Sequence, residues 1–417
     1  MTDRGFSRRQ FLETAAKCGV VAGGAGLLLG GTGGLTRLLA AEGEAAAAPD
    51  SLAALIAAAP VARYWTSTAK EGVSCLLCHE AGALGETRKH NHKPPVVKCE
   101  LCAHGCVIQD GERGRCRARI NVKGELRTLV YGRPITVHVD PIEKKPFYHV
   151  LPGSVAYSLA TSGCPLRCKF CQNWEISQAR PEDYRSPYTS PERVAASAKA
   201  APAPVIAYTY DEPTVFTEYL TDIARAGRKL GLRSVIISCG FMQEAPLAEM
   251  IEVLDGIKID LKGFDERFYR EVSQAELRPV LRSIKQVAKS GRHLEIVNLV
   301  VPTLNDSEKM LTELAKWVVN EAGPDVPVHF TRFHPDYQLR NLPPTPVATL
   351  ERAREIAMAQ GIRYAYVGNV PGHPGNQTYC PSCKKVVIER QGFFLAQMNL
   401  KEGKCAFCGT KIAGVWA

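Results

Sequence analysis

Short apolar runs alternate with helical patterns along the second half of the chain. The stretches 214–230 and 306–320 have the pattern of helices, and the apolar runs around them have the length of buried strands. Such alternation predicts α/β architecture built from parallel β/α units. Six or seven units fit a partial or near-complete (β/α) barrel, with its chemistry at the carboxyl ends of the strands. The expected strands are 155–162, 204–210, 234–238, 256–261, 293–301, 326–333 and 363–367.

The pattern changes on both sides of this α/β region. Upstream, residues 126–151 are predicted to be strand-rich, with apolar runs at 129–131 and 135–139. Cysteine-rich stretches lie before and after the α/β region, and 417 residues suit two or three domains. We expect a leader and linker at 1–48, a Cys-rich region at 60–150, the barrel at 151–370 and a small metal knuckle at 371–417.

Composition and charge are those of a globular protein, with 45% hydrophobic and 23% charged residues. The 52 basic residues outnumber the 42 acidic ones, and the net charge of +10 favours an acidic partner or an anionic surface. Because the basic residues are dispersed and not interleaved with aromatic ones, nucleic acid is not indicated. Most of the fifteen cysteines stand in C-x2-C pairs or in one short loop, which favours metal sites over disulfides.

The N-terminus carries the pattern of a targeting segment. Residues 7–12, Ser-Arg-Arg-Gln-Phe-Leu, form a twin-arginine signature, and a glycine-rich apolar stretch follows at 18–34. The pattern resembles a signal for the twin-arginine translocon, which exports folded, cofactor-loaded proteins. We therefore expect a periplasmic or membrane-anchored protein, with action in the cytoplasm before export left open. A disordered basic leader is the alternative.

One loop carries three cysteines at an uncommon spacing. Cys164, Cys168 and Cys171 form C-x3-C-x2-C directly after an apolar run that ends in Gly163. Three thiolates can hold three irons of a cubane, whereas iron–sulfur clusters normally take four cysteines. Since the next cysteine is Cys239, the loop predicts a cluster with an open coordination site for a small molecule. Three structural cysteines without a metal are the alternative.

This loop resembles the signature of the radical S-adenosylmethionine (radical SAM) superfamily. The aromatic Phe170 before the last cysteine and the Gln-Asn-Trp at 172–174 belong to the resemblance. The stretches 130–154 and 163–178 look like the radical SAM enzyme of the AmmeMemoRadiSam system, which is related to pyruvate formate-lyase activating enzymes. The resemblance covers about residues 95–370.

The resemblance implies a partial (β/α)6-type radical SAM barrel with a [4Fe–4S] cluster on Cys164, Cys168 and Cys171. SAM would chelate the open iron, and one electron from a reductant protein would cleave SAM to a 5′-deoxyadenosyl radical that abstracts hydrogen. The relation to activating enzymes implies a protein or peptide substrate. An exported electron-transfer protein with iron–sulfur or haem centres is the alternative function, and a metal-stapled binding protein without turnover is another.

Polar residues follow several of the expected strands. Glu212 resembles the superfamily's contact to the amino group of SAM, and a carboxylate suits an ammonium group. Lys258, Asp260 and Lys262 share one face of a strand, and the last two resemble contacts to SAM and to a substrate backbone. A solvated strand end is the alternative for each residue. His334 is equally open to a ligand contact, a proton carrier and a packed loop histidine. The predicted cofactor contacts are Glu212, Ser238, Asp260, Lys262, Asn298 and His334.

Two further cysteine groups precede the barrel. The first is a self-contained set of four thiols that suits zinc or an iron–sulfur cluster, with disulfides as the alternative in an exported protein. It also matches the AmmeMemoRadiSam group. The second is a C-x-x-C-H pattern that is typical of haem c attachment. Another metal site, completed by His90 and His92, and no ligand at all remain open for it. The first set is Cys99, Cys102, Cys106 and Cys116; the second is Cys75, Cys78 and His79.

The C-terminal tail carries two C-x2-C pairs, Cys380/Cys383 and Cys405/Cys408. This spacing resembles a zinc ribbon or a rubredoxin-like knuckle, and small structural four-cysteine sites favour zinc over mononuclear iron. A metal would stabilise a segment that is too small to fold on its own core.

Overall fold

An eight-stranded sheet forms the centre of the computed structural model, which describes residues 51–68 and 95–417. Strands β7 to β13 are parallel and stand in the order of the sequence, and β6 pairs antiparallel with β7 at one edge. The carboxyl ends of seven strands therefore lie at the same end of the sheet. The strands are β6 Thr136–Pro141, β7 Val155–Ala160, β8 Val205–Tyr208, β9 Arg233–Ser238, β10 Gly256–Asp260, β11 His293–Val300, β12 Val328–Arg332 and β13 Ala365–Gly368.

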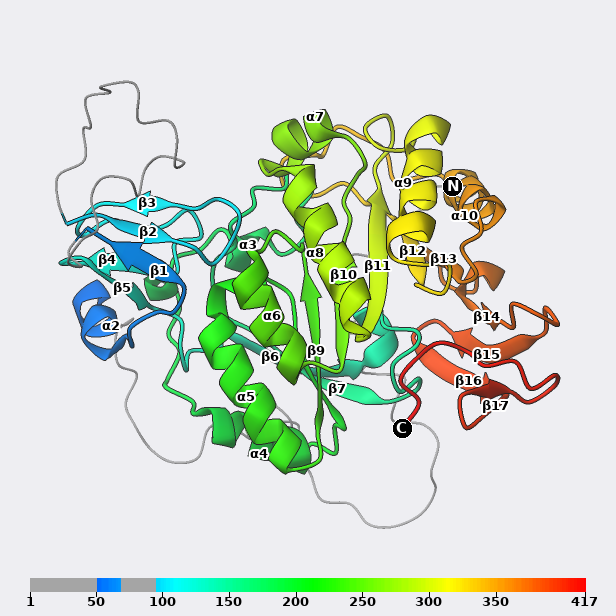
Figure 1. Cartoon of the computed structure of the whole chain (residues 1–417), viewed down its shortest axis with the longest axis horizontal. Helices are drawn as coiled ribbons and strands as arrows, with labels where there is room; N and C mark the ends of the chain where they lie inside the picture. The colour runs from blue at the N-terminus through cyan, green and yellow to red at the C-terminus, as the bar shows by residue number, and fades with distance from the viewer. Residues whose placement is uncertain (1–50, 69–94) are drawn as a thin grey trace, which may run out of the picture. The chain divides into compact units, whose positions relative to one another are not determined.

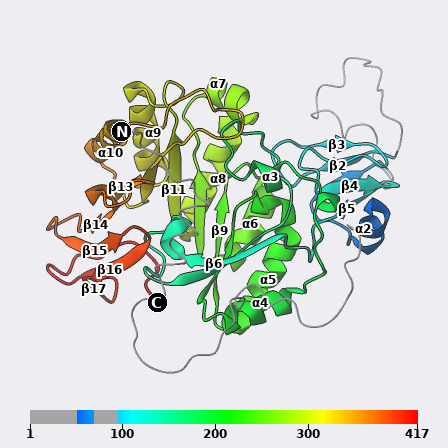
Figure 2. The ribbon, with the colours of Figure 1, turned by 180° about the vertical axis from the view of Figure 1, so that it is seen from behind.

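The connecting helices cover one face of this sheet. Most of the longer ones lie in front of the strands in Figure 1, and the turned view of Figure 2 shows β6 and β9 from the other side. The helices are α3 Trp174–Ser177, α4 Pro191–Ala200, α5 Thr217–Lys229, α6 Glu244–Val253, α7 Glu266–Phe268, α8 Leu277–Ser290, α9 Glu308–Glu321 and α10 Val347–Ala359. Short 3-10 turns lie at η2 Ile142–Lys144, η3 Pro181–Asp183, η4 Pro213–Phe216 and η6 Pro374–Asn376, and a π turn lies at η5 Tyr269–Ser273.

Apolar spacing explains how these elements pack. Helix α8 buries Leu277, Val280, Ile284 and Val287, which recur every three or four residues and form one apolar stripe. The helix ends at Gly291, whose positive φ of 73° is the usual left-handed cap. All four residues of β8 are buried, as expected for a parallel strand covered on both faces.

Each of the seven strands expected from the apolar runs is present, and the mixed α/β class is confirmed. The expected helix at 214–230 begins with the 3-10 turn η4 before α5. The apolar run at 129–131 was wrongly predicted to be a strand. The strand ends at Thr128, and Leu129 and Val130 form a turn that buries both side chains. Burial in a turn and burial in a strand leave the same apolar signal in the sequence.

The Cys-rich region forms small antiparallel pieces beside α5. They are drawn in blue and cyan in Figure 1, and their pairing orders are β1-β2-β3 and β4-β5. The fully buried Arg119 donates two hydrogen bonds to the Glu218 carboxylate of α5, at 2.6 and 2.7 Å. The elements are α2 Leu52–Ala58, β1 Trp65–Ser67, β2 Val97–Cys99, β3 Val107–Ile108, β4 Arg119–Val122 and β5 Glu125–Thr128.

An Arg119→Met variant should lower the free energy of unfolding by about 3–5 kcal/mol, because the carboxylate of Glu218 stays buried without its partner. Urea unfolding followed by tryptophan fluorescence measures this loss. Arg267→Met is the matched control: its ion pair with Glu271 is exposed and should cost less than about 1 kcal/mol. Equal losses in the two variants would contradict the role assigned to Arg119.

The C-terminal segment forms a second set of small sheets, drawn in orange and red in Figure 1. Arg390 of β15 is fully buried, donates to the carbonyl of Tyr148 and lies 3.9 Å from the buried carboxylate of Glu143. This arginine therefore joins the C-terminal segment to the chain that leads into β7. The strands are β14 Thr378–Tyr379, β15 Val386–Gln391, β16 Phe394–Met398, β17 Leu400–Lys401 and β18 Lys404–Cys405.

The twin-arginine segment and the group of Cys75, Cys78 and His79 lie outside the described residues, as do His90 and His92. Within the described ranges, no helix has both the length and the apolar character that crossing a membrane requires.

Candidate active site at the carboxyl ends of the strands

The three-cysteine loop begins immediately after β7. Gly163, which precedes Cys164, has a φ of +103°, and a side chain there would place its Cβ 2.4 Å from the carbonyl oxygen of Cys116. Only glycine allows this close approach of two backbone segments. The loop therefore starts in direct contact with the Cys-rich region.

The three cysteines of this loop pack against the main hydrophobic core. Cys168 is buried, while Cys164 and Cys171 are partly buried. Burial raises the pKa of Cys168 to about 11, and Lys262 opposes this shift. Burial also raises the pKa of Cys164, with further contributions from Glu212 and the other two thiols. Because burial disfavours the thiolate forms, a positive metal centre beside these cysteines would stabilise them.

Hydrogen bonds to two other parts of the fold hold the loop. The amide of Arg167 donates to Ser273, and the amide of Lys169 donates to Val272, both at 3.0 Å. The amide of Gln338, in the segment after β12, donates to the carbonyl of Lys169 at 2.9 Å. The sulfur positions are thus fixed by contacts distant in sequence.

Aromatic stacking closes the same side of the site. Trp174, just after the last cysteine, stacks on Tyr337 with ring centroids 5.2 Å apart and an interplanar angle of 12°. Tyr337 follows β12, so the loops after the first and the sixth parallel strands meet here.

Glu212 and Ser238 come together at the ends of β8 and β9. The buried Glu212 carboxylate accepts hydrogen bonds from the Ser238 hydroxyl and from the amide of Cys239, both at 2.7 Å. It also accepts from the amide and the hydroxyl of Thr214. Glu212 therefore joins two strand ends, and its oxygens are occupied by donors of the chain itself.

Asp211, beside Glu212 at the same strand end, was not among the predicted cofactor contacts. Its Oδ2 accepts a hydrogen bond from Thr161 at 3.3 Å, and its buried Oδ1 lacks a hydrogen-bond partner among the described residues. Burial, together with Glu212, raises its pKa well above the ordinary value. The preceding Tyr210 has a positive φ of 73°, and its carbonyl accepts from the Asn173 side chain. In the sequence, only its position at the end of a strand indicates that Asp211 belongs to the site.

Cys239 is a fourth thiol near the loop. It is buried, and burial followed by the charges of Glu212 and Cys164 raises its pKa well above the ordinary value. The sequence separates Cys239 from Cys171 by many residues, so spacing alone placed it outside the site.

Two lysines share one carboxylate at the end of β10. Asp260 lies 2.6 Å from the Lys258 ammonium and 2.9 Å from that of Lys262. Despite burial, the two lysines hold the pKa of Asp260 below its ordinary value. The Lys262 ammonium also lies 5.8 Å from the ring centroid of Phe170 in the cysteine loop. Lys258, Asp260 and Lys262 thus lie together at the end of β10 as expected, and the Lys262 ammonium lies near the cysteine loop.

Asn298 and His334 differ in their placement. Asn298 on β11 is buried, and its amide donates to the carbonyl of Leu261 at 2.7 Å, while its Oδ1 lacks a partner in the described part of the chain. His334 is exposed on the segment after β12, and burial of part of its ring together with Arg332 lowers its pKa. The structure groups Asn298 with the end of β10 and leaves His334 at the rim.

The C-terminal thiols converge on one point. Cys380 and Cys408 have sulfurs 3.6 Å apart, and those of Cys383 and Cys405 are 3.7 Å apart. The four sulfurs all lie within 4.8 Å of one another. A tetrahedron with Zn–S bonds of about 2.3 Å places its sulfurs roughly 3.8 Å apart, so this donor set fits a single ion.

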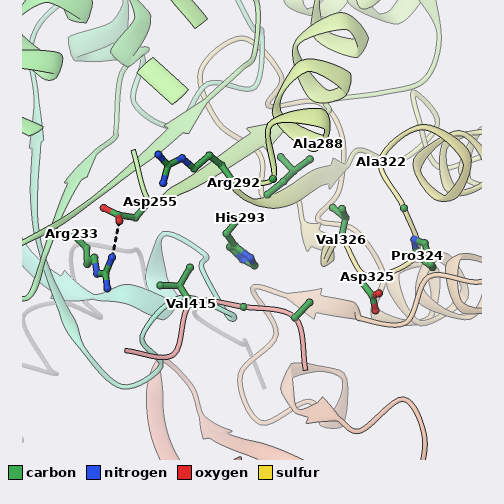
Figure 3. Close-up of a pocket in the computed structure, with 15 residues that line it drawn as sticks. Arg233, Asp255, Ala288, Arg292, His293, Ala322, Pro324, Asp325, Val326 and Val415 are labelled. Carbon is green, nitrogen blue, oxygen red and sulfur yellow. Dashed lines mark hydrogen bonds and ion pairs between the residues drawn. The ribbon is translucent and has the colours of Figure 1, made fainter. Parts of the chain in front are cut away.

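A cavity of about 530 Å³ lies at the opposite end of the sheet (Figure 3). Its lining includes Arg233 and His293, which begin β9 and β11, and Val415 of the C-terminal tail. Arg233 pairs there with Asp255 at 3.0 Å. The cavity is distinct from the cysteine loop, which follows the carboxyl end of β7.

Comparison with known proteins identifies the family. A model of the radical SAM superfamily matches residues 158–315, which run from β7 into α9. The uncharacterized protein MJ0808 of Methanocaldococcus jannaschii is 42% identical over 318 residues, or 76% of this chain and 95% of the relative. The chain belongs to the radical SAM superfamily. The three-cysteine loop and the strand-end residues lie within the stretch that the radical SAM model matches or directly beside it.

More distant radical SAM relatives include activating enzymes. The pyruvate formate-lyase-activating enzyme of Clostridium pasteurianum is 23% identical over 198 residues, which cover 43% of this chain and 80% of that enzyme. Among solved structures, Streptococcus suis SuiB has 13% identity and a TM-score of 0.41 over 55% of this chain and 52% of its own. The homology to activating enzymes is weak, and this radical SAM enzyme is similar to them in only part of its length.

Proposed function

We propose that this radical SAM enzyme cleaves SAM reductively and abstracts hydrogen from a protein or peptide substrate. The observation that supports it best is the set of three buried or partly buried thiols on one loop, with the Lys262 ammonium 5.8 Å from the ring centroid of Phe170 in that loop. The sequential parallel strands suit the partial barrel that the sequence predicts. When bound, a [4Fe–4S] cluster supplies the electron that splits SAM into methionine and a 5′-deoxyadenosyl radical.

Different residues of the chain would hold the cluster and SAM. Cys164, Cys168 and Cys171 would ligate three irons and leave the fourth for SAM. Asp211 offers an unpartnered buried oxygen that suits an ammonium group. Glu212 keeps the ends of β8 and β9 together and thereby positions its neighbour.

The end of β10 would bind the anionic part of the cofactor. Lys262 is directed by Asp260 and lies near the aromatic ring of the loop, so its ammonium can meet a carboxylate there. Burial of this region excludes water, which strengthens each charge interaction and protects a radical from side reactions.

The substrate class rests on the relation to activating enzymes. The pyruvate formate-lyase-activating enzyme is, by its name, an enzyme that acts on another protein. We propose the same class of substrate here, and we propose that the C-terminal quartet binds zinc in a ribbon-like knuckle.

The test is SAM cleavage by protein reconstituted with iron and sulfide without oxygen and then reduced. We expect 5′-deoxyadenosine and methionine in equal amounts, measured by liquid chromatography and mass spectrometry. A cluster-loaded, reduced protein that forms no 5′-deoxyadenosine would refute the proposal and leave the electron-transfer alternative.

A Lys262→Met variant should bind SAM roughly 10–100-fold more weakly, because a hydrogen bond to a charged group contributes about 1.5–3 kcal/mol. Equilibrium binding to the cluster-loaded protein measures this change. Lys289→Met removes an exposed lysine of α8 and serves as the control, with unchanged affinity expected. Unaltered SAM affinity in Lys262→Met would exclude a direct contact.

A further inference from the structure

The four thiols of the Cys-rich region gather in space, although they lie on different small elements. The amide of Cys99 donates to the carbonyl of Cys106 at 2.9 Å, and Cys102 lies on the short connection between these two residues. A Cβ at Gly114 would be 3.9 Å from the sulfurs of both Cys106 and Cys116. The set is therefore one group of donors and not two separate pairs.

The spacing of this set differs from that of the C-terminal quartet. In the described residues, only the C-terminal thiols bring three or more ligand atoms within 4.8 Å of one another. The gathered sulfurs of Cys99, Cys102, Cys106 and Cys116 are thus spread more widely than the sulfurs around one ion. A cubane places its own irons and sulfides between the cysteines and requires this wider spacing. The C-terminal thiols therefore fit a single metal ion, whereas the four thiols of the Cys-rich region fit a larger cluster.

A backbone amide donates to one sulfur of the set. The amide of Arg115 donates to the Cys106 sulfur at 3.5 Å. Amides that face cysteine sulfurs stabilise the negative charge of an iron–sulfur centre and tune its reduction potential.

The set lies directly against the three-cysteine loop. The carbonyl of Cys116 touches Gly163, the residue before Cys164. One guanidinium, that of Arg167, donates both to the carbonyl of Cys164 and to the carbonyl of Arg115, which precedes Cys116. Arg167 therefore bonds both to Cys164 of the three-cysteine loop and to the residue directly before Cys116 of the four-thiol set.

Two more contacts fix the same interface. The Nε of Arg115 donates to the carbonyl of Pro165 at 3.1 Å, and the ring of His104 bonds to the same oxygen at 2.9 Å. His104 stands two residues after Cys102, and Pro165 stands directly after Cys164. The contact is therefore made by the ligand-bearing segments themselves.

We infer that Cys99, Cys102, Cys106 and Cys116 hold a second [4Fe–4S] cluster, docked on the loop of the first. The metal assignment stands without the proposed function, whereas its role rests on that function. In that role the second cluster takes one electron from a low-potential donor protein of the ferredoxin class and passes it to the centre on Cys164, Cys168 and Cys171. The donor loses one electron, and the second cluster returns to its oxidised state in every cycle.

Metal analysis of anaerobically reconstituted full-length protein tests the assignment. The triple variant Cys164→Ala, Cys168→Ala, Cys171→Ala should retain about four irons and four sulfides. Its dithionite-reduced form should give the electron paramagnetic resonance signal of one [4Fe–4S] cluster. The matched variant Cys102→Ala, Cys116→Ala should lose this signal and keep that of the first cluster. Zinc and no iron in the triple variant would overturn the inference, as would four thiols that titrate as two disulfides.

Measurements on the intact protein separate this inference from the proposed function. We expect about eight irons per chain and two signals on reduction, of which SAM alters only the one with the open iron. About four irons per chain would overturn the second cluster even if the triple variant does not fold. Eight irons without 5′-deoxyadenosine would refute the proposed function and leave the second cluster in place.

Discussion

A Cys168→Ala variant is expected to form at least roughly a hundredfold less 5′-deoxyadenosine than the wild type, since even changes in the shell around metal ligands cost 10–100-fold. Cys168 is buried, and the charges of Lys262 and Cys171 act on its thiol. With two thiolates of the loop left, the cubane would lose one of the three ligands that the loop provides. Quantification of 5′-deoxyadenosine after anaerobic reconstitution and reduction measures the loss.

Lys169→Ala is the control for this variant. Lys169 is the next residue of the same loop, and it bonds to Val272 and Gln338 through its backbone, which the substitution retains. We expect this control to cleave SAM as the wild type does. SAM cleavage by Cys168→Ala at the wild-type rate would show that the loop does not hold the catalytic cluster.

A Cys383→Ser variant is expected to lose one zinc ion per chain and to unfold at a temperature lower by on the order of 10 °C, since 1 kcal/mol shifts the midpoint of proteins of 150–250 residues by about 2–4 °C. The four converging sulfurs replace the core that this small segment lacks. When the segment opens, Arg390 leaves Glu143 and Tyr148, which then remain buried without their partner.

Thermal unfolding and zinc content, measured on the same preparation, check this expectation. Lys411→Ala changes an exposed residue of the same segment and should alter neither value. The iron content of Cys383→Ser should stay that of the wild type, because the cysteines proposed to bind iron lie on other segments. An unchanged midpoint would contradict a structural role, and iron in place of zinc would assign the quartet to another metal.

Local sequence patterns predicted much of the fold and part of the candidate site. Apolar runs predicted seven strands because a parallel strand covered on both faces must be apolar along its length. The C-x3-C-x2-C loop and the two C-x2-C pairs were visible because metal ligands that are close in sequence are held by short turns. The failure at 129–131 has the same origin, since a buried turn has the apolar signal of a strand.

Contacts between distant segments were not predictable in this way. Nothing in the spacing of residues indicates that Cys239 lies near Cys164, or that Asp211 keeps an unpartnered oxygen while Glu212 is fully bonded. These relations depend on which strands are neighbours and on the register between them.

The sequence by itself indicated the three-cysteine loop and the two C-terminal pairs, because the cysteines of each stand a few positions apart. Only the tertiary structure decided how widely the sulfurs of each set are spaced and which sets touch. Cys116 and Cys164 stand far apart in the chain, and the glycine at 163 allows their backbones to meet. Packing of distant segments sets that distance, so no local pattern contains it.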